Sequence, residues 1–452
     1  MGVRGLFKEL ERRGLRRRQF VATPDAMRAL GPAQRHIVID ACSATGFIHN
    51  HLMYGGEFLR MESKIRGYVH QFVAAGFRVT AVIDGALDAA KRDEWLQRRV
   101  TELRRMSTIH VDINTANRAH RLAKWPSNAE MACVPNWKSL VAELFMGAGC
   151  EVVMSPVEAD REAAGLCVLS SGFGVISNDS DMLVFGLPRV VNPDTIRKVD
   201  GRLALEYFDA NDISRALGIP TSLMPLFASL AGNDFVPTCA PKLARHSPSK
   251  AGPSGPESDA PVHPITVVAD FMAHECAEGR IKEGCAEEWL DAVPFLSDKV
   301  KGGIRQSMQQ YTIKTRTDLI LEKSGPFALK SIQLWDSYQH TKGVSPMKLL
   351  YQVVADRAVF ESACMELGMP VSVWAITEEL RHNLYDLVLA PIRDTAPCVK
   401  EVVISPLESC RSPSEPYVPK FSFVDEFRVP VVPGEPIAMF VFTAHMSTLM
   451  RC

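Results

Sequence analysis

Residues 175–187 read VISNDSDMLVFGL, and this stretch decides the fold that we expect. Val175 and Ile176 have the pattern of a short buried strand, and Asp179 and Asp181 follow before apolar residues resume. Two carboxylates between apolar runs are costly to bury unless a cation neutralises them. Open α/β sheets bind their ligands just beyond the carboxyl ends of the strands. We therefore expect the functional centre of the chain at this point.

The same pattern occurs twice upstream. His36–Asp40 reads HIVID and Arg78–Asp84 reads RVTAVID, and each is a short apolar run that ends in an aspartate. Continuous apolar runs are typical of buried parallel strands. A helix predicted over residues 47–75 would join the two strands in a right-handed βαβ unit with both aspartates at one sheet edge. A single such aspartate is often only a helix N-cap, but two in consecutive units fit that alternative less well.

Further acids follow at similar positions. Glu158 and Asp160 lie in PVEADREAA, before a small-residue helix predicted over residues 162–169. Helix capping and the helix dipole are an alternative explanation for this pair. Asp234 follows a helix predicted over residues 222–230, in the turn AGND. Other predicted strands cover residues 151–154, 174–177, 190–191 and 203–208.

These acids predict a particular metal chemistry. Oxygen ligands without His or Cys favour Mg²⁺ or Mn²⁺ over zinc. Two such ions about 3.5–4 Å apart catalyse in-line phosphodiester cleavage, because one activates water and both stabilise charge on the phosphate. The predicted catalytic and metal-binding residues are Asp40, Asp84, Glu158, Asp160, Asp179, Asp181 and Asp234.

Two basic segments accompany the acids. Residues 1–20 contain six arginines, one lysine and two glutamates on a predicted short helix and turn, and residues 87–106 form a predicted charged helix with Lys91, Arg92, Arg98 and Arg99. Both segments fit solvated helix faces as well as phosphate-binding surfaces.

The composition limits the class of protein. The chain has 452 residues, 46% of them hydrophobic, a formal net charge of −1 and 11 cysteines. The cysteines form no C-x-x-C pair, which argues against a zinc site or a disulfide framework. With neither a signal peptide nor an apolar span visible, we expect an intracellular protein, nuclear or cytoplasmic.

We expect four regions. Residues 1–235 would form an α/β nuclease-type domain, and residues 236–264, rich in Pro, Ser, Gly and Lys, a flexible linker or loop. Residues 265–395 would be mainly helical, with helices over 265–278, 286–292, 298–311, 346–367 and 376–389. Residues 396–452 would be an irregular tail with short strands.

The order of MGVRGL, IVID, VIDG, PVEADREAA, SNDSDMLVFG and AGND resembles the flap-endonuclease (XPG-like) superfamily over roughly the first half of the chain. The resemblance implies a PIN-like α/β fold and a metal-dependent, structure-specific nuclease that acts on branched or single-stranded DNA or RNA. It implies that Asp40, Asp84, Glu158 and Asp160 bind one metal and that Asp179, Asp181 and Asp234 bind the other, with some sharing. The nucleic-acid contacts would be Gly2, Arg4, Lys91, Arg92, Arg98 and Arg99.

The sequence departs from that family after Asp234. The glycine-containing helical hairpin that grips duplex DNA in flap endonucleases is replaced by FVPTCAPKLARHSPSKAGPSG. Together with ELRHNLYDLVLAP and VKEVVIS in the second half, this departure is similar to the asteroid branch of the superfamily. The resemblance therefore leaves two functions open. One is a nuclease, and the other is a nucleic-acid-binding or signalling adaptor that has protein partners and little catalysis.

Overall fold

The structure is a computed structural model that describes residues 2–44, 58–85, 137–246 and 263–323, together with residues 97, 101, 329, 332–333, 336, 358–361, 382, 385–386 and 400–403. The chain forms two compact units, and each is built from separate segments. The first unit contains residues 1–44, 70–80 and 160–315, and the second contains residues 45–69, 81–159 and 316–452.

The first unit is organised around parallel strands. Its strand order is β1-β8-β6-β5-β2, followed by the start of β3, with β7 beside β8. The strands β2, β5 and β6 pair in parallel, whereas β8 runs antiparallel to β1, β6 and β7. The bounds are β1 Arg18–Val21, β2 His36–Asp40, β3 Arg78–Asp84, β5 Gly174–Ile176, β6 Val190–Val191, β7 Arg197–Val199 and β8 Arg202–Phe208. The α/β class and the parallel centre of the sheet are as predicted.

Side chains from several strands build the core of this unit. Every residue of β2 is buried, as are Val175 and Ile176 of β5, so these short apolar runs are covered on both faces. The ring of Phe173 makes edge contacts with Phe20 and Phe77, at centroid distances of 4.9 and 5.1 Å. This packing fixes the strands whose carboxyl ends carry the candidate acids.

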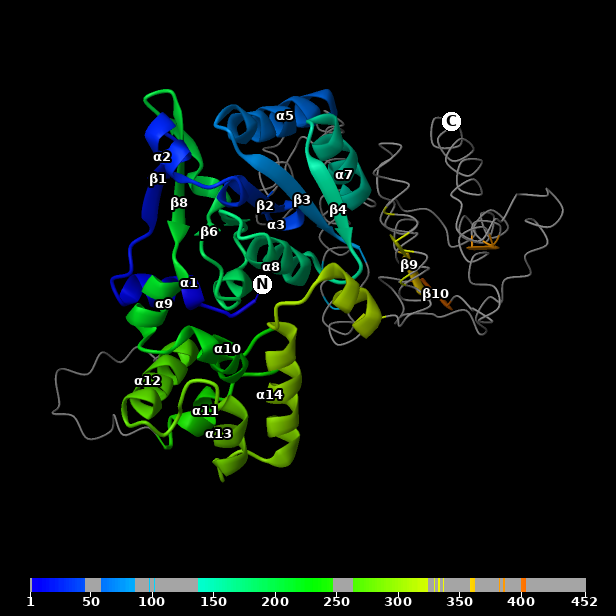
Figure 1. Ribbon diagram of the computed structural model, residues 1–452. Helices are drawn as coiled ribbons and strands as arrows, with labels where there is room; N and C mark the ends of the chain where they lie inside the picture. Colours follow the sequence, from blue (N-terminus) through cyan, green and yellow to red (C-terminus); the bar gives the residue numbers. More distant parts are fainter. Residues whose placement is uncertain are drawn as a thin grey trace, which may run out of the picture. The chain divides into compact units, whose positions relative to one another are not determined.

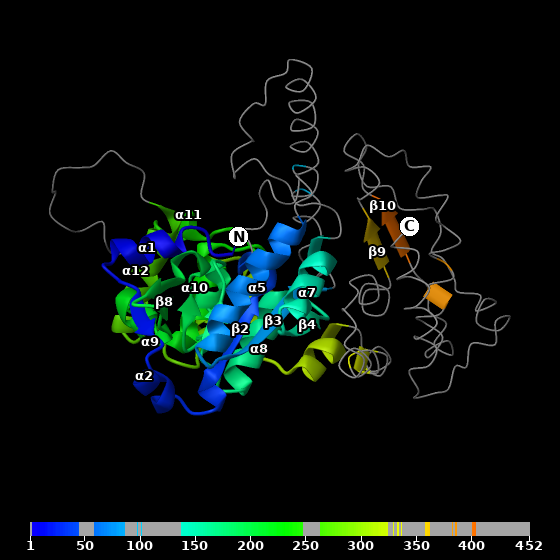
Figure 2. The ribbon, with the colours of Figure 1, turned by 90° about the horizontal axis from the view of Figure 1, so that it is seen from above.

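Helices complete the first unit. The helix α10 packs against α12 and α14, and α1 lies against α9 and α12. Figure 1 shows α10 beside α12 and α14, and Figure 2 shows α1 beside α12. The bounds are α1 Leu6–Arg12, α2 Pro24–Ala29, α3 Ala41–Ala44, α8 Ala159–Leu169, α9 Ala210–Leu217, α10 Met224–Ala231, α11 Ala240–Leu243, α12 Pro264–Ala277, α13 Ala286–Ala292 and α14 Asp298–Gln310. Short 3-10 helices are η1 Ala33–Arg35, η5 Ser180–Leu183, η6 Pro193–Thr195 and η7 Thr221–Leu223.

The second unit contains the last residues of β3, which neighbour β4 (Glu151–Ser155). The helix α7 (Trp137–Gly147) contacts β4, and α5 (Phe58–Ala74) starts in this unit. A side chain at Gly85 would meet the Ser155 carbonyl oxygen at 2.1 Å, so glycine is required where the chain leaves β3. Two short strands, β9 (Ala358–Glu361) and β10 (Lys400–Val403), pair in parallel.

Some local predictions need correction. The predicted helix over residues 346–367 is wrong at 358–361, which form β9, because pairing with the distant β10 decides that structure. The predicted linker contains α11, where Ala240 and Leu243 are buried. The predicted helix over residues 47–75 is described only from Phe58 onward, and it ends with Gly76 at φ +94°. The predicted helix over 376–389 lies mostly outside the described residues, and the domain boundaries stay predictions.

Within the described residues, no helix combines the length and the apolar character that a membrane crossing requires.

Candidate active site

The edge of the first unit's sheet brings Asp40 beside residues that follow β5. Asp40 is the last residue of β2 and is 3% exposed. Its Oδ1 accepts a hydrogen bond from the backbone of Ser43 at 3.1 Å, and its Oδ2 accepts one from the hydroxyl of Ser177 at 2.9 Å. Because β2 and β5 are parallel neighbours, their carboxyl ends meet at this edge, as the sequence predicted.

The 3-10 helix η5 carries the next two acids. Ser177 Oγ accepts the backbone N–H of Asp179 at 3.0 Å, so the same hydroxyl contacts the segments of Asp40 and Asp179. Asp179 caps η5, because its Oδ1 accepts the backbone N–H of Asp181 at 3.1 Å. Asp181 is 3% exposed and Asp179 is half-buried. Three of the predicted acids therefore share one hydrogen-bonded neighbourhood.

The start of the chain lies directly against this pair of acids. Gly2 is buried with φ +73°, and a β-carbon there would lie 2.4 Å from Asp179 Oδ1 and 2.8 Å from Asp181 Oδ1. The hydroxyl of Ser180 donates to the Val3 carbonyl at 3.1 Å, which holds the segment in place. Only glycine fits this conformation and this space without strain. The predicted site residue Gly2 thus lies beside the acids.

A polar network approaches Asp181 from the helices. The hydroxyl of Tyr311, the residue after α14, donates to Asp181 Oδ1 at 3.0 Å. Asn233 Nδ2 donates to the Tyr311 hydroxyl at 3.0 Å and to Ser307 Oγ at 2.8 Å. Burial raises the pKa of the Tyr311 phenol well above its usual value, and the nearby charge of Asp181 raises it further. Tyr311 therefore stays protonated and acts as a hydrogen-bond donor.

The remaining acids lie at other positions. In the first unit, Asp160 is in the first turn of α8 and Asp234 follows α10; both are half-buried. In the second unit, Asp84 Oδ1 accepts the backbone N–H of Ala159 at 2.7 Å, and Glu158 is half-buried. Asp84 thus accepts a backbone hydrogen bond, which is the kind of capping role that the sequence left open. Capping does not exclude ligation, because a carboxylate has about four acceptor sites.

The donor chemistry suits a hard cation, but the described geometry is not a closed metal cage. The side chains around Asp40, Asp179 and Asp181 present only oxygen, which fits Mg²⁺ or Mn²⁺. Among the residues that the structure describes, no group of three or more His, Cys, Asp or Glu side chains is arranged to hold a metal ion. A two-metal arrangement therefore stays a prediction.

The basic surface is described only in part. Lys91, Arg92, Arg98 and Arg99 lie outside the described residues. In the N-terminal segment, Arg12 and Arg13 contact Glu9, and Arg18 contacts Asp212, so much of the basic charge is used for packing. Arg4 and Lys8 are exposed and form no ion pair within the described part of the chain.

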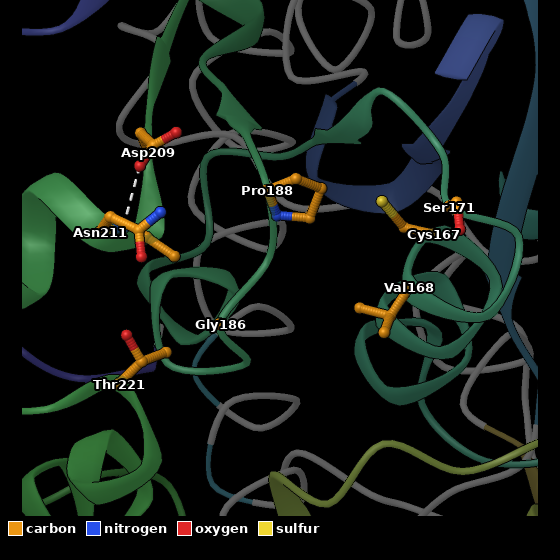
Figure 3. Close-up of a pocket in the computed structure, with 9 residues that line it drawn as sticks. Cys167, Val168, Ser171, Gly186, Pro188, Asp209, Asn211 and Thr221 are labelled. Carbon is orange, nitrogen blue, oxygen red and sulfur yellow. Dashed lines mark hydrogen bonds between the residues drawn. The ribbon is translucent and has the colours of Figure 1, made fainter. Parts of the chain in front are cut away.

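A separate cavity of about 350 Å³ lies between the end of α8 and the start of α9 (Figure 3). Asp209, Asn211 and Thr221 line one side and Cys167 lines the other. Burial raises the pKa of the Cys167 thiol to about 12, so this cysteine is a poor nucleophile at neutral pH. The candidate acids are not among its lining residues.

Comparison with known proteins identifies the region around these acids. Residues 149–234 match the XPG I-region family. The chain carries an XPG I-region and is homologous to flap endonucleases. This region contains five of the seven predicted acids, and it confirms the predicted resemblance to the flap-endonuclease superfamily and its asteroid branch.

Three relatives illustrate the range of this homology. The chain is 29% identical over 210 residues to the constitutive coactivator of peroxisome proliferator-activated receptor gamma from Homo sapiens, a match that covers 44% of this chain and 21% of that protein. It is 27% identical over 218 residues to the single-strand DNA endonuclease ASTE1 from Danio rerio, covering 45% and 29%. It is 27% identical over 173 residues to flap endonuclease 1 from Methanosphaerula palustris, covering 37% and 51%. The matches thus span only part of each relative.

Solved structures are less similar. The catalytic core of Rad2 aligns with 17% identity and a TM-score of 0.34, covering 70% of this chain and 80% of that chain. Human GEN1 in complex with Holliday junction DNA aligns with 12% identity and a TM-score of 0.37, covering 99% and 98%.

Sequence reasoning missed the polar residues that hold the XPG I-region acids. Ser177 and Asn233 stand in the quoted motifs, one immediately after β5 and the other immediately before Asp234, so their positions gave a usable signal. Tyr311 lies 130 residues from Asp181 and has no motif around it. Only the folded chain brings it to the site.

Proposed function

We propose that the chain is a divalent-metal-dependent, structure-specific nuclease that acts on branched or single-stranded nucleic acid. The single observation that supports this most is the placement of the XPG I-region acids Asp179 and Asp181 against Gly2, in one hydrogen-bonded neighbourhood with Asp40. A phosphodiesterase needs carboxylates at one point and access for the backbone of its substrate. We also propose that the protein works inside the cell, in the nucleus or the cytoplasm.

The metal would be Mg²⁺ or Mn²⁺. The candidate ligands in the first unit are Asp40, Asp179 and Asp181, with Asp160 and Asp234 as further candidates, and those in the second unit are Asp84 and Glu158. A bound divalent ion would supply an activated water and stabilise charge on the scissile phosphate. The chain's own contribution is orientation, because Ser177 fixes an oxygen of the Asp40 carboxylate through a hydrogen bond.

The substrate would be held by cations near the acids. Arg4 and Lys8 follow Gly2 closely in the chain and are exposed, which suits contact with phosphates that flank the cleaved bond. Lys91, Arg92, Arg98 and Arg99 would steer the backbone further along. Phosphate contacts of this kind position a strand without reading its sequence, which matches recognition of structure.

An adaptor function is the second candidate. Three relatives that match at 26% to 29% identity are named as constitutive coactivators of peroxisome proliferator-activated receptor gamma. Acidic side chains also outnumber basic ones across α12–α14, so these helices are poorly suited to grip a phosphate backbone. In this alternative the helices of the first unit, or the region after residue 323, would bind protein partners.

Cleavage assays on the purified full chain separate the two candidates. Flap, single-stranded DNA and single-stranded RNA substrates would be incubated with Mg²⁺, Mn²⁺ or EDTA. If the chain is a nuclease, we expect metal-dependent cleavage that disappears in the Asp179→Ala/Asp181→Ala double variant. Equal products from the wild-type and double-variant proteins would show that the activity is not at this site. Nucleic-acid binding without cleavage in any metal would favour the adaptor.

A further inference from the structure

Tyr311 is the polar residue at the candidate site whose placement the function above does not require. It is the residue immediately after α14, and its side chain is 5% exposed. Its ring packs edge-on against Phe185, with a centroid distance of 5.4 Å and an interplanar angle of 64°. The ring therefore has an apolar contact that does not depend on the hydroxyl.

The direction of the Tyr311 hydrogen bonds follows from its neighbours. Asn233 Oδ1 accepts the backbone N–H groups of Phe235 and Val236, which orients the amide so that Nδ2 points to the phenol. A phenol has one O–H proton. Tyr311 therefore accepts a hydrogen bond from Asn233 and donates one to Asp181. The hydrogen bond to the carboxylate is thus fixed by the chain's own geometry.

The same hydroxyl connects two candidate ligands. It donates directly to Asp181, and it anchors Asn233, the residue immediately before Asp234. Ser307, one turn earlier on α14, accepts a second hydrogen bond from Asn233 at 2.8 Å and one from Ser229 of α10 at 2.8 Å. The end of α14 therefore holds the turn that carries Asp234 as well as the Asp181 side chain.

We propose that Tyr311 is a positioning residue that orients the Asp181 carboxylate and the Asp234 turn for a divalent cation. This inference rests on the proposed metal-dependent nuclease function. A carboxylate can accept a hydrogen bond and coordinate a metal at the same time, and the hydrogen bond restricts its rotation. Loss of such a partner typically weakens metal binding or activity by about 10–100-fold.

The test compares Tyr311→Phe with Tyr207→Phe in the full chain. The first substitution keeps the ring that packs on Phe185 and removes only the hydroxyl. Tyr207 lies on β8, is 9% exposed and packs against Phe173. Its substitution is the same chemical change at a similarly buried position, away from the hydrogen bonds of Tyr311. Thermal unfolding would be followed against Mg²⁺ concentration after EDTA treatment, and kcat, KM and the half-saturating Mg²⁺ concentration would be measured for cleavage.

We expect Tyr311→Phe to raise the half-saturating Mg²⁺ concentration by about 10-fold or more in both measurements. The kcat at limiting Mg²⁺ should fall while the KM for nucleic acid stays unchanged, because the phenol does not contact the substrate. Tyr207→Phe should leave all these values as in the wild type. If Tyr311→Phe unfolds in EDTA, Ser307→Ala takes its place, with a smaller rise expected in the same direction.

Two outcomes overturn the inference, and only one of them also overturns the proposed nuclease function. A wild-type chain that binds and cleaves with Mg²⁺, and a Tyr311→Phe variant with the same Mg²⁺ dependence, would leave the nuclease function standing and overturn only the positioning role. A wild-type chain whose melting temperature does not respond to metal, and which cleaves nothing, would overturn both proposals.

Discussion

Glu9 and Asp181 are both almost completely buried in the first unit, at 2% and 3% exposure, but they are held by different donors. Glu9 receives hydrogen bonds from two guanidinium groups, those of Arg12 and Arg13, and from the hydroxyl of Thr266 on α12. Asp181 accepts a hydrogen bond from the neutral phenol of Tyr311. A guanidinium neutralises the carboxylate that it holds, whereas a phenol only orients it.

The difference separates a structural acid from a candidate functional one. The Glu9 cluster ties α1 to α12, and Arg13 extends it through contacts with Asp270 and the carbonyl of Leu217 at the end of α9. Around Asp181 the chain places a second carboxylate and a close glycine backbone instead. Two neighbouring carboxylates repel each other, and a bound cation would relieve that repulsion. This arrangement therefore favours cation binding. Four experiments test this contrast.

The largest expected effect comes from removing the candidate ligands. Asp179→Ala with Asp181→Ala should reduce metal-dependent cleavage by at least about 10³-fold, since a bound metal ion would activate the attacking water and stabilise charge on the phosphate. The metal-free protein should melt at the same temperature or higher, because repulsion between neighbouring carboxylates is relieved. Cleavage rates and EDTA melting curves measure this. A large fall in the melting temperature would show that Asp181, like Glu9, has a structural role.

The second-largest effect is expected from a substitution of Gly2, which lies against Asp179 and Asp181. Gly2→Ala should lower cleavage by about 10-fold or more, because its β-carbon would push Asp179 and Asp181 apart and such displacements are costly at active sites. Gly14→Ala is the matched control. Gly14 has φ +75°, close to the +73° of Gly2, but a β-carbon on Gly14 would have no neighbouring atom within 4 Å. Equal activity of the two variants would separate Gly2 from the candidate site.

The third effect concerns the structural acid and pH. Burial alone would raise the pKa of Glu9, but the hydrogen bonds from Arg12, Arg13 and Thr266 outweigh it and lower that pKa to about 2. Its stabilisation is therefore complete above the unfolded-state pKa of 4.5 and is lost as pH falls from there toward about 2. We expect a loss on the order of 1–3 kcal/mol in the free energy of unfolding over that range.

Urea unfolding at several pH values measures this loss. Glu9→Gln should make the stability less dependent on pH in that window, since its side chain does not titrate. Glu11→Gln is the matched control, because Glu11 is exposed and its Oε1 lies 3.8 Å from Arg17 Nη2, too far for a hydrogen bond. If both variants retain the wild-type dependence on pH, Glu9 is not the group that controls it.

The smallest expected effect tests the exposed cations near Gly2. Arg4→Glu with Lys8→Glu should weaken nucleic-acid binding by up to about 10-fold at low salt and reduce the slope of log affinity against log salt by about 1–2. Arg28→Glu on α2 is the control, because Arg28 is exposed but already pairs with Asp25. Fluorescence anisotropy across a salt series measures the slope. A slope equal to that of the control would exclude Arg4 and Lys8 from the binding surface.

The sequence predicted those parts of the site that depend on local pattern. Apolar runs that end in an acid located β2, β3 and β5 with Asp40, Asp84 and the Asp179–Asp181 pair, because burial on both faces leaves a clear signature. It did not predict Tyr311, because a contact between residues 130 positions apart depends on how α14 packs. It also misassigned residues 358–361, where pairing with β10 overrides the local preference.

The division of each unit among distant segments has a consequence for how the chain is made. β1 has its partner in β8, with Arg18 opposite Tyr207, so the first strand of the sheet cannot pair until β8, far along the chain, has been synthesised. At roughly 5–20 residues per second, a ribosome would need about 10 s or more to supply that partner. During that interval β1 lacks its pairing partner, and in a fragment that stops before β8 it lacks that partner permanently. We therefore expect a fragment that ends before β8 to aggregate more readily than the full chain.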